Sequence, residues 1–241
     1  MKLYLSRWVC LDVESNLHRL KEEICRAAMD GASIAVLPEL FLGGYQREID
    51  AETARESFAA ASRAFPELLC VFGSHSEEGL NRLTAWQGGE EVAHYDKVHL
   101  FHPNHEHELW APGERFTAMD FGGLRIGFLL CNDIRYPEAA RALRLKARCD
   151  LLIVPAWWPW RRDHIWRTLL QARAIENAMW VAGVSVSASV FPGEEFAGAG
   201  NYVFDPLGDP VPTPSFALHE RKLLETKGSV FLSNYKKCQK R

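Results

Sequence analysis

Short apolar segments alternate with helical patterns along most of the chain, and this alternation constrains the fold more than any other feature. Helical spacing of apolar residues occurs over 15–31, 51–64, 137–147 and 163–179. Apolar runs typical of strands cover 3–10, 32–39, 68–74, 124–131, 149–156, 180–188 and 200–209, and a hairpin is expected over 83–100 around Gly88-Gly89. Ser15 is expected to cap the first helix. Interleaved strands and helices with some hairpins predict an α/β sandwich with mixed sheets and helices on the outer faces.

Length and charge narrow the class of protein. The chain has 241 residues, and we expect a single domain over 1–241 with a short basic tail from about 233. A net charge of −3 without a basic block argues against nucleic acid as a partner. No apolar run is long enough to cross a membrane, and the start lacks the pattern of a signal peptide. We therefore expect a cytoplasmic protein with no membrane partner.

The cysteines do not form a disulfide pattern. Six are scattered along the chain without a CxxC pair, at positions 10, 25, 70, 131, 149 and 238. In a chain of this length such scatter is typical of reduced thiols. One of the thiols is then available as a nucleophile.

Three predicted strands have candidate site residues at or just after their carboxyl ends. Glu39, Cys131 and Ala156 each come at or just after the carboxyl end of an apolar run. Ligands of α/β sheets bind outside the carboxyl ends of strands. We therefore expect these three strand ends to border one site.

Cys131 is the candidate nucleophile. A thiol attacks a carbonyl carbon as the thiolate, so it needs a base or a nearby cation. Glu39 is the candidate base, and Lys97 is the candidate cation, which would favour the thiolate and stabilise an oxyanion. The backbone N–H of Asn132 would be a second oxyanion donor. Each of these residues taken alone is more often structural than catalytic.

Taken together, the motifs resemble those of the carbon–nitrogen hydrolases, or nitrilase superfamily, and of its amidase and carbamoylase-like branch in particular. "LPELFLGGY" resembles the segment of the general base, "YDKVHLF" the lysine segment and "CNDIRYPE" the nucleophile segment. "EHELWAPG" fits the loop that carries a further glutamate, here Glu106. "VPAWW", "HIWRTLLQARAIEN" and "YVFDPLG" match later segments of the family.

The resemblance implies a four-layer α-β-β-α sandwich and a thiol hydrolase with the catalytic set Glu39, Lys97 and Cys131. Cleavage of a C–N bond of a small molecule would pass through a cysteine acyl-enzyme and release ammonia. Glu106 would hold Lys97 or the substrate nitrogen in place. No metal or organic cofactor is implied, and the family suggests a homodimer or larger oligomer.

The residues after the nucleophile bear on the substrate. Nitrilases usually have Trp-Glu after the cysteine, whereas this chain has Asn132-Asp133, similar to N-carbamoyl-D-amino-acid hydrolases. An amide or carbamoyl substrate is therefore expected, with nitrile hydrolysis as the alternative. Arg135 is a candidate for binding a substrate carboxylate, with a structural role at a helix start as the alternative. Tyr45 and Trp157 are candidates for the wall of the pocket.

Two other interpretations remain open. "HPNHEH" brings together His102, His105 and His107, which would suit a metallohydrolase, although the spacing is not H-E-x-x-H. A non-catalytic binding protein of the same fold is the second alternative. Loss of activity to chelators would favour the first, and fast alkylation of Cys131 would favour the thiol enzyme.

Overall fold

The computed structural model describes residues 1–45, 49–196, 200–212 and 215–217, and the expected basic tail from about 233 lies outside these residues. The α-helices are α1 (Val13–Met29), α2 (Ala51–Arg63), α3 (Glu106–Leu109), α4 (Pro137–Leu145) and α5 (Asp163–Asn177). Three short 3-10 helices are η1 (His102–Asn104), η2 (Cys131–Arg135) and η3 (Trp160–Arg162). The strands are β1 (Lys2–Leu5), β2 (Val9–Cys10), β3 (Ile34–Val36), β4 (Leu69–Glu77), β5 (Leu80–Gln87), β6 (Glu90–Asp96), β7 (Ala118–Phe121), β8 (Leu124–Phe128), β9 (Leu151–Ala156), β10 (Trp180–Ser185), β11 (Ala188–Ser189), β12 (Tyr202–Phe204), β13 (Pro210–Val211) and β14 (Ser215–Ala217).

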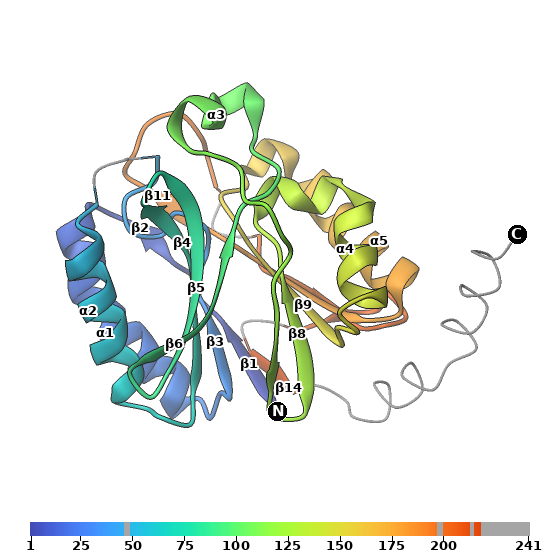
Figure 1. The fold of residues 1–241 in the computed structure, drawn as a ribbon, viewed down its shortest axis with the longest axis horizontal. Coiled ribbons are helices and arrows are strands. Elements are labelled where there is room, and N and C mark those ends of the chain that lie inside the picture. The colour runs from blue at the N-terminus through green and yellow to red at the C-terminus, as the bar shows by residue number, and fades with distance from the viewer. Residues whose placement is uncertain (46–48, 197–199, 213–214, 218–241) are drawn as a thin grey trace, which may run out of the picture.

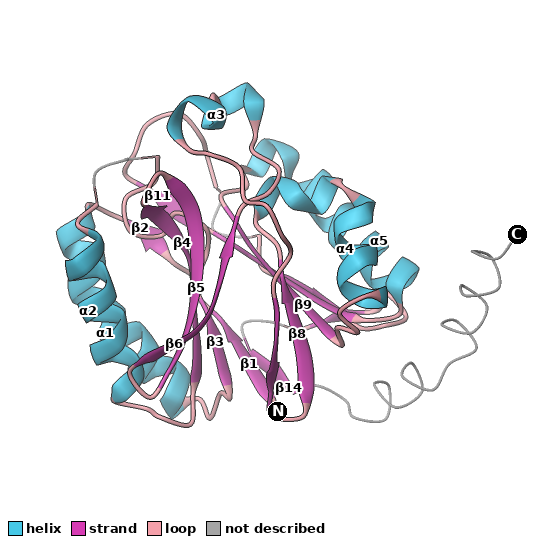
Figure 2. Cartoon of the chain, viewed as in Figure 1, coloured by secondary structure: helices cyan, strands magenta, loops and turns pink. Residues whose placement is uncertain are grey.

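Two six-stranded sheets pack face to face between two layers of helices (Figure 1). One sheet has the order β14-β1-β3-β4-β5-β6 and the other β13-β12-β10-β9-β8-β7. Each is parallel at its centre and antiparallel toward its edges. Helices α1 and α2 cover the outer face of the first sheet, and α4 and α5 cover the second (Figure 2). The α-β-β-α sandwich with mixed sheets is confirmed.

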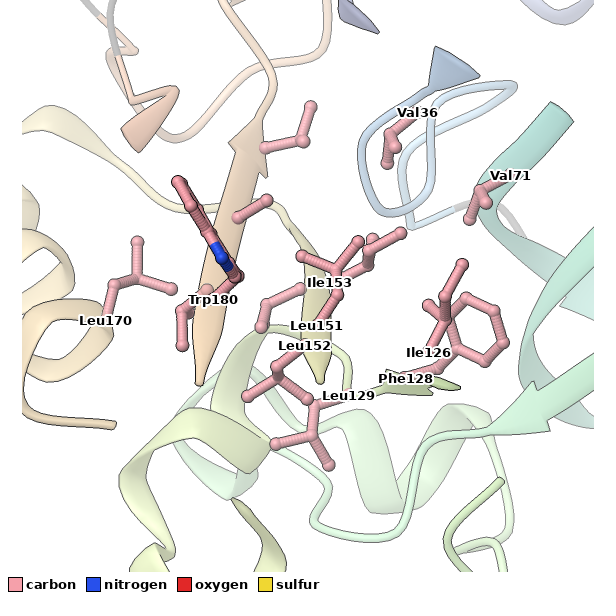
Figure 3. Packing of buried hydrophobic residues seen from close by; sticks show 14 of the residues in the cluster. Val36, Val71, Ile126, Phe128, Leu129, Leu151, Leu152, Ile153, Leu170 and Trp180 are labelled. Carbon is pink, nitrogen blue, oxygen red and sulfur yellow. The ribbon is translucent and has the colours of Figure 1, made fainter. Parts of the chain in front are cut away.

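Central strands are buried on both faces, which explains their continuous apolar runs. In β4, Leu69 and Val71 belong to the core between the sheets, whereas Cys70 and Phe72 face α1 and α2. Successive side chains of a strand point to opposite faces, so both halves of the run are needed. Figure 3 shows the inter-sheet core, where Val71 lies opposite residues of the second sheet such as Phe128.

The first strand is shorter than the sequence predicts. The run over 3–10 divides into β1 and β2, and β2 pairs with β11 in a separate small sheet. Between the two strands the indole N–H of Trp8 donates to the carbonyl of Phe41 at 2.8 Å, which draws the chain out of the large sheet. Helix α1 is capped by Asp12, not by Ser15 as predicted, because the Ser15 N–H donates to the Asp12 carboxylate at 2.9 Å.

Two further elements differ from the prediction. The 83–100 segment forms the expected β5–β6 hairpin at Gly88-Gly89, but β5 begins at Leu80 and pairs also with β4 across a turn at Glu78-Gly79. The edge strand β7 was not predicted, because it has only four residues and none of them is buried. Within the described ranges, no helix is long and apolar enough to span a membrane.

Candidate active site

Glu39 lies in a loop that follows β3 and crosses the neighbouring strand closely. A Cβ at Gly73 in β4 would lie 1.8 Å from the carbonyl oxygen of Pro38, so only glycine lets this loop pass. The Glu39 carboxylate is fully buried. It accepts hydrogen bonds from the Asn81 amide at 3.0 Å and from the Trp157 backbone N–H at 2.8 Å. Both of its oxygens are therefore fixed in position.

Lys97 lies between two buried carboxylates. It follows β6 directly, and its ammonium lies 2.8 Å from a Glu39 oxygen and 2.8 Å from a Glu106 oxygen. Glu106, in α3, also accepts from the backbone N–H of Phe101 at 2.7 Å and from the Tyr45 hydroxyl at 3.3 Å. Lys97 and Glu39 are fully buried and Glu106 is 1% exposed, so water screens these charges little.

Cys131 begins the 3-10 helix η2 after β8 in a left-handed backbone conformation, with a φ of 43°. This conformation is uncommon for a non-glycine residue and clusters at functional sites. Helix α5 holds the segment from the other side, because buried Arg173 donates to the carbonyl of Ile134 at 3.1 Å. Arg173 also pairs with Glu176 at 3.1 Å, as their spacing on one helix face predicts.

Asp133 joins the turn that begins at Cys131 to the segment that carries Lys97. Its fully buried carboxylate accepts from the Tyr95 hydroxyl at 2.7 Å and from both the backbone and the ring nitrogen of His99 at 2.8 Å. It also accepts from the Leu130 N–H at 2.9 Å. The side chain of Asn132 donates to two carbonyls of the same segment, at 3.1 and 3.2 Å. These contacts hold the chain around Cys131 against the segment that carries Lys97.

Burial and charge set the protonation of the thiol and the ammonium. Burial and the negative charge of Glu39 raise the pKa of the Cys131 thiol well above its ordinary value, and Lys97 only partly opposes them. Lys97 lowers the pKa of the thiol, in the direction that favours the thiolate as expected, but burial and Glu39 outweigh it. Burial alone would lower the pKa of Lys97, but Glu39 and Glu106 outweigh it and raise that pKa well above its usual range. Burial also raises the pKa of Glu106, against the influence of Lys97.

Six of the predicted site residues line one narrow pocket, whereas Glu39 and Lys97 do not line it and are joined to it through the contact of Lys97 with Glu106. Its lining residues include Cys131, Asn132, Glu106, Tyr45, Trp157 and Arg135, together with Trp158, Phe101, Asn104 and Arg162. The Arg135 guanidinium lies 4.9 Å from the centre of the Trp158 ring. Sequence reasoning did not find Arg162, whose guanidinium lies over the Phe101 ring at 5.3 Å. It also missed Asn81, which lies 42 positions from its partner Glu39.

The histidine cluster does not form the metal site that the metallohydrolase alternative needs. The rings of His102 and His107 stack at 4.4 Å, and His105 is exposed beside Glu108 at 3.0 Å. Glu106, between them in sequence, turns inward to Lys97. Among the residues that the structure describes, no group of three or more potential ligands is arranged to hold a metal ion.

Comparison with known proteins gives the same family at the level of sequence. A family model described as carbon-nitrogen hydrolase matches residues 5–190. Omega-amidase YafV of Escherichia coli strain K12 is 31% identical over 212 residues, which cover 85% of this chain and 80% of that protein. The 2-oxoglutaramate amidase of Bacillus subtilis strain 168 is 32% identical over 188 residues, with 73% and 71% covered.

Solved structures are similar over nearly the whole chain. XC1258 from Xanthomonas campestris, described as a CN-hydrolase superfamily protein with an arsenic adduct in its active site, has a TM-score of 0.81 at 25% identity, with 93% of this chain and 92% of that chain covered. A mutant of the Nesterenkonia AN1 amidase, from the nitrilase superfamily, has a TM-score of 0.75 at 27% identity, with 88% and 84% covered.

Proposed function

This chain belongs to the carbon–nitrogen hydrolase family of the nitrilase superfamily, and we propose that it hydrolyses amides through Cys131. The enzyme is an amidohydrolase that cleaves an amide C–N bond through a cysteine. The observation that carries the assignment is Lys97, held at 2.8 Å from both Glu39 and Glu106 beside the pocket that contains Cys131.

The proposed mechanism uses Glu39 as the shared acid and base. Glu39 takes the proton from the Cys131 sulfur, and the thiolate forms a bond to the amide carbon. Lys97 and the backbone N–H of Asn132 stabilise the oxyanion of the tetrahedral intermediate. Glu39 then gives its proton to the nitrogen, the C–N bond breaks, and ammonia leaves a thioester on Cys131.

Water completes the cycle. Glu39 takes a proton from a water molecule that attacks the thioester, and the carboxylic acid leaves as the proton returns to the sulfur of Cys131. Glu106 holds the ammonium of Lys97 in place throughout, because it contacts that group with both oxygens, at 2.8 and 3.0 Å. No step in this scheme requires a group from outside the chain other than water.

For the substrate we propose a short ω-amide whose far end carries a carboxylate. Two relatives are named omega-amidase and 2-oxoglutaramate amidase, which supports an amide with an acidic end. Arg135 and Arg162 both line the Cys131 pocket, and a guanidinium binds a carboxylate through two parallel hydrogen bonds. Tyr45 and Trp157 wall the same pocket. An N-carbamoyl compound is the second candidate, because Asn132-Asp133 resembles the carbamoylase segment.

The test is ammonia release from ω-amides, short aliphatic amides, N-carbamoyl amino acids and nitriles. We expect the wild type to release ammonia from ω-amides fastest and Cys131→Ala to release none. Cys25→Ala, a free cysteine outside this pocket, is the matched control and keeps full activity. Equal activity of Cys131→Ala and the wild type would exclude the proposed nucleophile. Nitriles as the best substrates would overturn the assignment of substrate class.

We also propose a single domain that acts in the cytoplasm as a homodimer. The five described cysteines are free thiols, which suits a reducing compartment. Ile175 in α5 and nearby Leu207 are 53% and 65% exposed on the outer face, which suits contact with a second copy. Light scattering after size exclusion tests the dimer, and Ile175→Asp is expected to shift it to monomer.

A further inference from the structure

A second cavity lies beside the Cys131 pocket, and the mechanism above makes no use of it. Its volume is about 390 Å³, within the range of small-molecule sites. It is lined by Gly43, Tyr45, Asn104, Trp157, Phe191, Pro192, Gly193, Glu194 and Phe196. Three of these residues, Tyr45, Asn104 and Trp157, also line the Cys131 pocket, so the two spaces adjoin.

The walls of this cavity are aromatic. Trp157 packs edge to face against Phe196 at 5.1 Å and against Tyr45 at 6.1 Å. A Cβ at Gly44 would lie 3.1 Å from the Phe191 ring and 3.3 Å from Trp157, so the absence of a side chain lets these rings approach the backbone. Such surfaces favour apolar and aromatic groups.

Charge in the lining is already paired. The Glu194 carboxylate accepts two hydrogen bonds from Arg161, at 3.0 and 2.6 Å, and lies 3.6 Å from Arg162. The backbone N–H of Trp160 donates to the carbonyl of Glu195 at 2.7 Å, and this bond holds the loop that carries Glu194 and Glu195 against η3. The loop is thus anchored, and the cavity favours an uncharged occupant over a charged one.

The contacts of the shared walls indicate which end of a substrate reaches the cavity. The Tyr45 hydroxyl donates to Glu106 at 3.3 Å, and the Trp157 backbone N–H donates to Glu39 at 2.8 Å. The wall formed by Trp157 therefore adjoins Glu39, the carboxylate that gives its proton to the nitrogen. Arg135 and Arg162 line the Cys131 pocket and are not among the residues that line the cavity.

We propose that the cavity binds an apolar aryl or branched alkyl substituent on the amide nitrogen, so that the enzyme also hydrolyses secondary amides. This inference rests on the proposed function and adds the identity of the leaving group. The bonds are those of the primary reaction: sulfur joins the acyl carbon, the C–N bond breaks, and Glu39 gives its proton to the nitrogen. A primary amine leaves in place of ammonia, and water then hydrolyses the thioester.

The experiment uses three substrates: the four-carbon ω-amide succinamate, its N-benzyl derivative, and the isomer with the benzyl group on the carbon chain. Release of ammonia or benzylamine gives kcat/KM for the wild type, Phe191→Ala and Val190→Ala. Val190 is the matched control, since it neighbours Phe191 but is 62% exposed and does not line the cavity.

We expect the wild type to hydrolyse the N-benzyl amide, and Phe191→Ala to lower the ratio of its kcat/KM to that of succinamate by about tenfold. The ratio for the carbon-substituted isomer stays unchanged, and Val190→Ala alters neither ratio. The inference is overturned if the wild type cleaves succinamate but not the N-benzyl amide, or if Phe191→Ala leaves its ratio unchanged. A fall only for the carbon-substituted isomer would place the acyl chain in the cavity instead. Failure of the wild type on all three substrates would instead refute the proposed ω-amide substrate, on which the inference rests.

Discussion

Replacing Lys97 with methionine tests the electrostatics of the site most directly. The substitution leaves Glu39 and Glu106 buried with their shared cation removed. Removing one partner of a buried ion pair costs about 3–5 kcal/mol, far more than an exposed pair is worth. With a urea m-value of about 3 kcal/mol/M for a chain of this size, the unfolding midpoint falls by about 1–1.7 M.

The loss of stability in Lys97→Met also depends on pH. Burial raises the pKa of Glu106 in the folded protein, and Lys97 is the group that lowers it. Without Lys97 that pKa rises further above the unfolded value. A carboxyl of this kind binds more protons when folded, so its stabilising effect is present at low pH and is lost as pH rises through the folded pKa. The destabilisation is therefore larger at about pH 8 than at about pH 5.

Urea unfolding of the wild type and the variant at both pH values measures this effect. Lys2→Met is the matched control, because Lys2 pairs with Asp30 at 3.1 Å with both side chains more than a third exposed. It should cost less than about 1 kcal/mol. The double variant Lys97→Met with Glu106→Gln should recover part of the lost stability. A loss below about 1 kcal/mol in Lys97→Met at both pH values would refute the reasoning.

Three further predictions address position and charge. Asp133→Asn should lower kcat by about a hundredfold with little change in KM, because it weakens the contacts that hold Cys131 against the segment of Lys97, and a small misplacement of reacting groups has an effect of this size. Steady-state kinetics on an ω-amide measures this. Gly73→Ala should lower both stability and activity, since its Cβ would overlap the backbone beside Glu39; thermal melts and the same assay report it. The third prediction concerns Glu77. Burial raises the pKa of its carboxyl, but contact with His75 and nearby arginines outweighs burial and lowers that pKa to about 2. The Glu77 carboxylate therefore stabilises the fold at pH values above its pKa in the unfolded chain, and this stabilisation is lost as pH falls toward 2. Between about pH 5 and pH 3 the melting temperature of Glu77→Gln should fall less than that of the wild type.

The layers of the fold could be predicted because burial on both faces leaves a clear mark in sequence. Runs such as the one in β9 are apolar at every position, and the helices between them keep one apolar face. The split of the first strand left no such mark, because it depends on the contact of Trp8 with Phe41, 33 positions away. The Asp12 cap was missed because Ser15 has an equally suitable side chain in the same turn.

The candidate site could be predicted where its residues follow strands and could not where they act at a distance. Glu39 and Cys131 come after apolar runs, and Lys97 follows a hairpin. Asn81 and Arg162 contact the site only through the packing of distant segments, and ordinary strand or helix residues have the same local pattern. The wall formed by Phe191 and Phe196 belongs to a loop without any periodicity, so its position beside Trp157 follows from the tertiary structure alone.

The raised pKa of the Cys131 thiol means that the sulfur is protonated in the free enzyme and must lose its proton before it can attack. Two carboxylates surround one ammonium, so the buried cluster carries a net negative charge when all three groups are ionised, and this charge adds to burial in keeping Cys131 protonated. A preformed thiolate would react with any electrophile that entered the pocket. In the proposed mechanism the proton passes to Glu39, whose two oxygens are already held by Lys97, Asn81 and Trp157. In that mechanism Lys97 stabilises the oxyanion that forms on attack, so an acyl group bound between the sulfur and the ammonium favours the transfer. We therefore expect deprotonation of the thiol to depend on bound substrate.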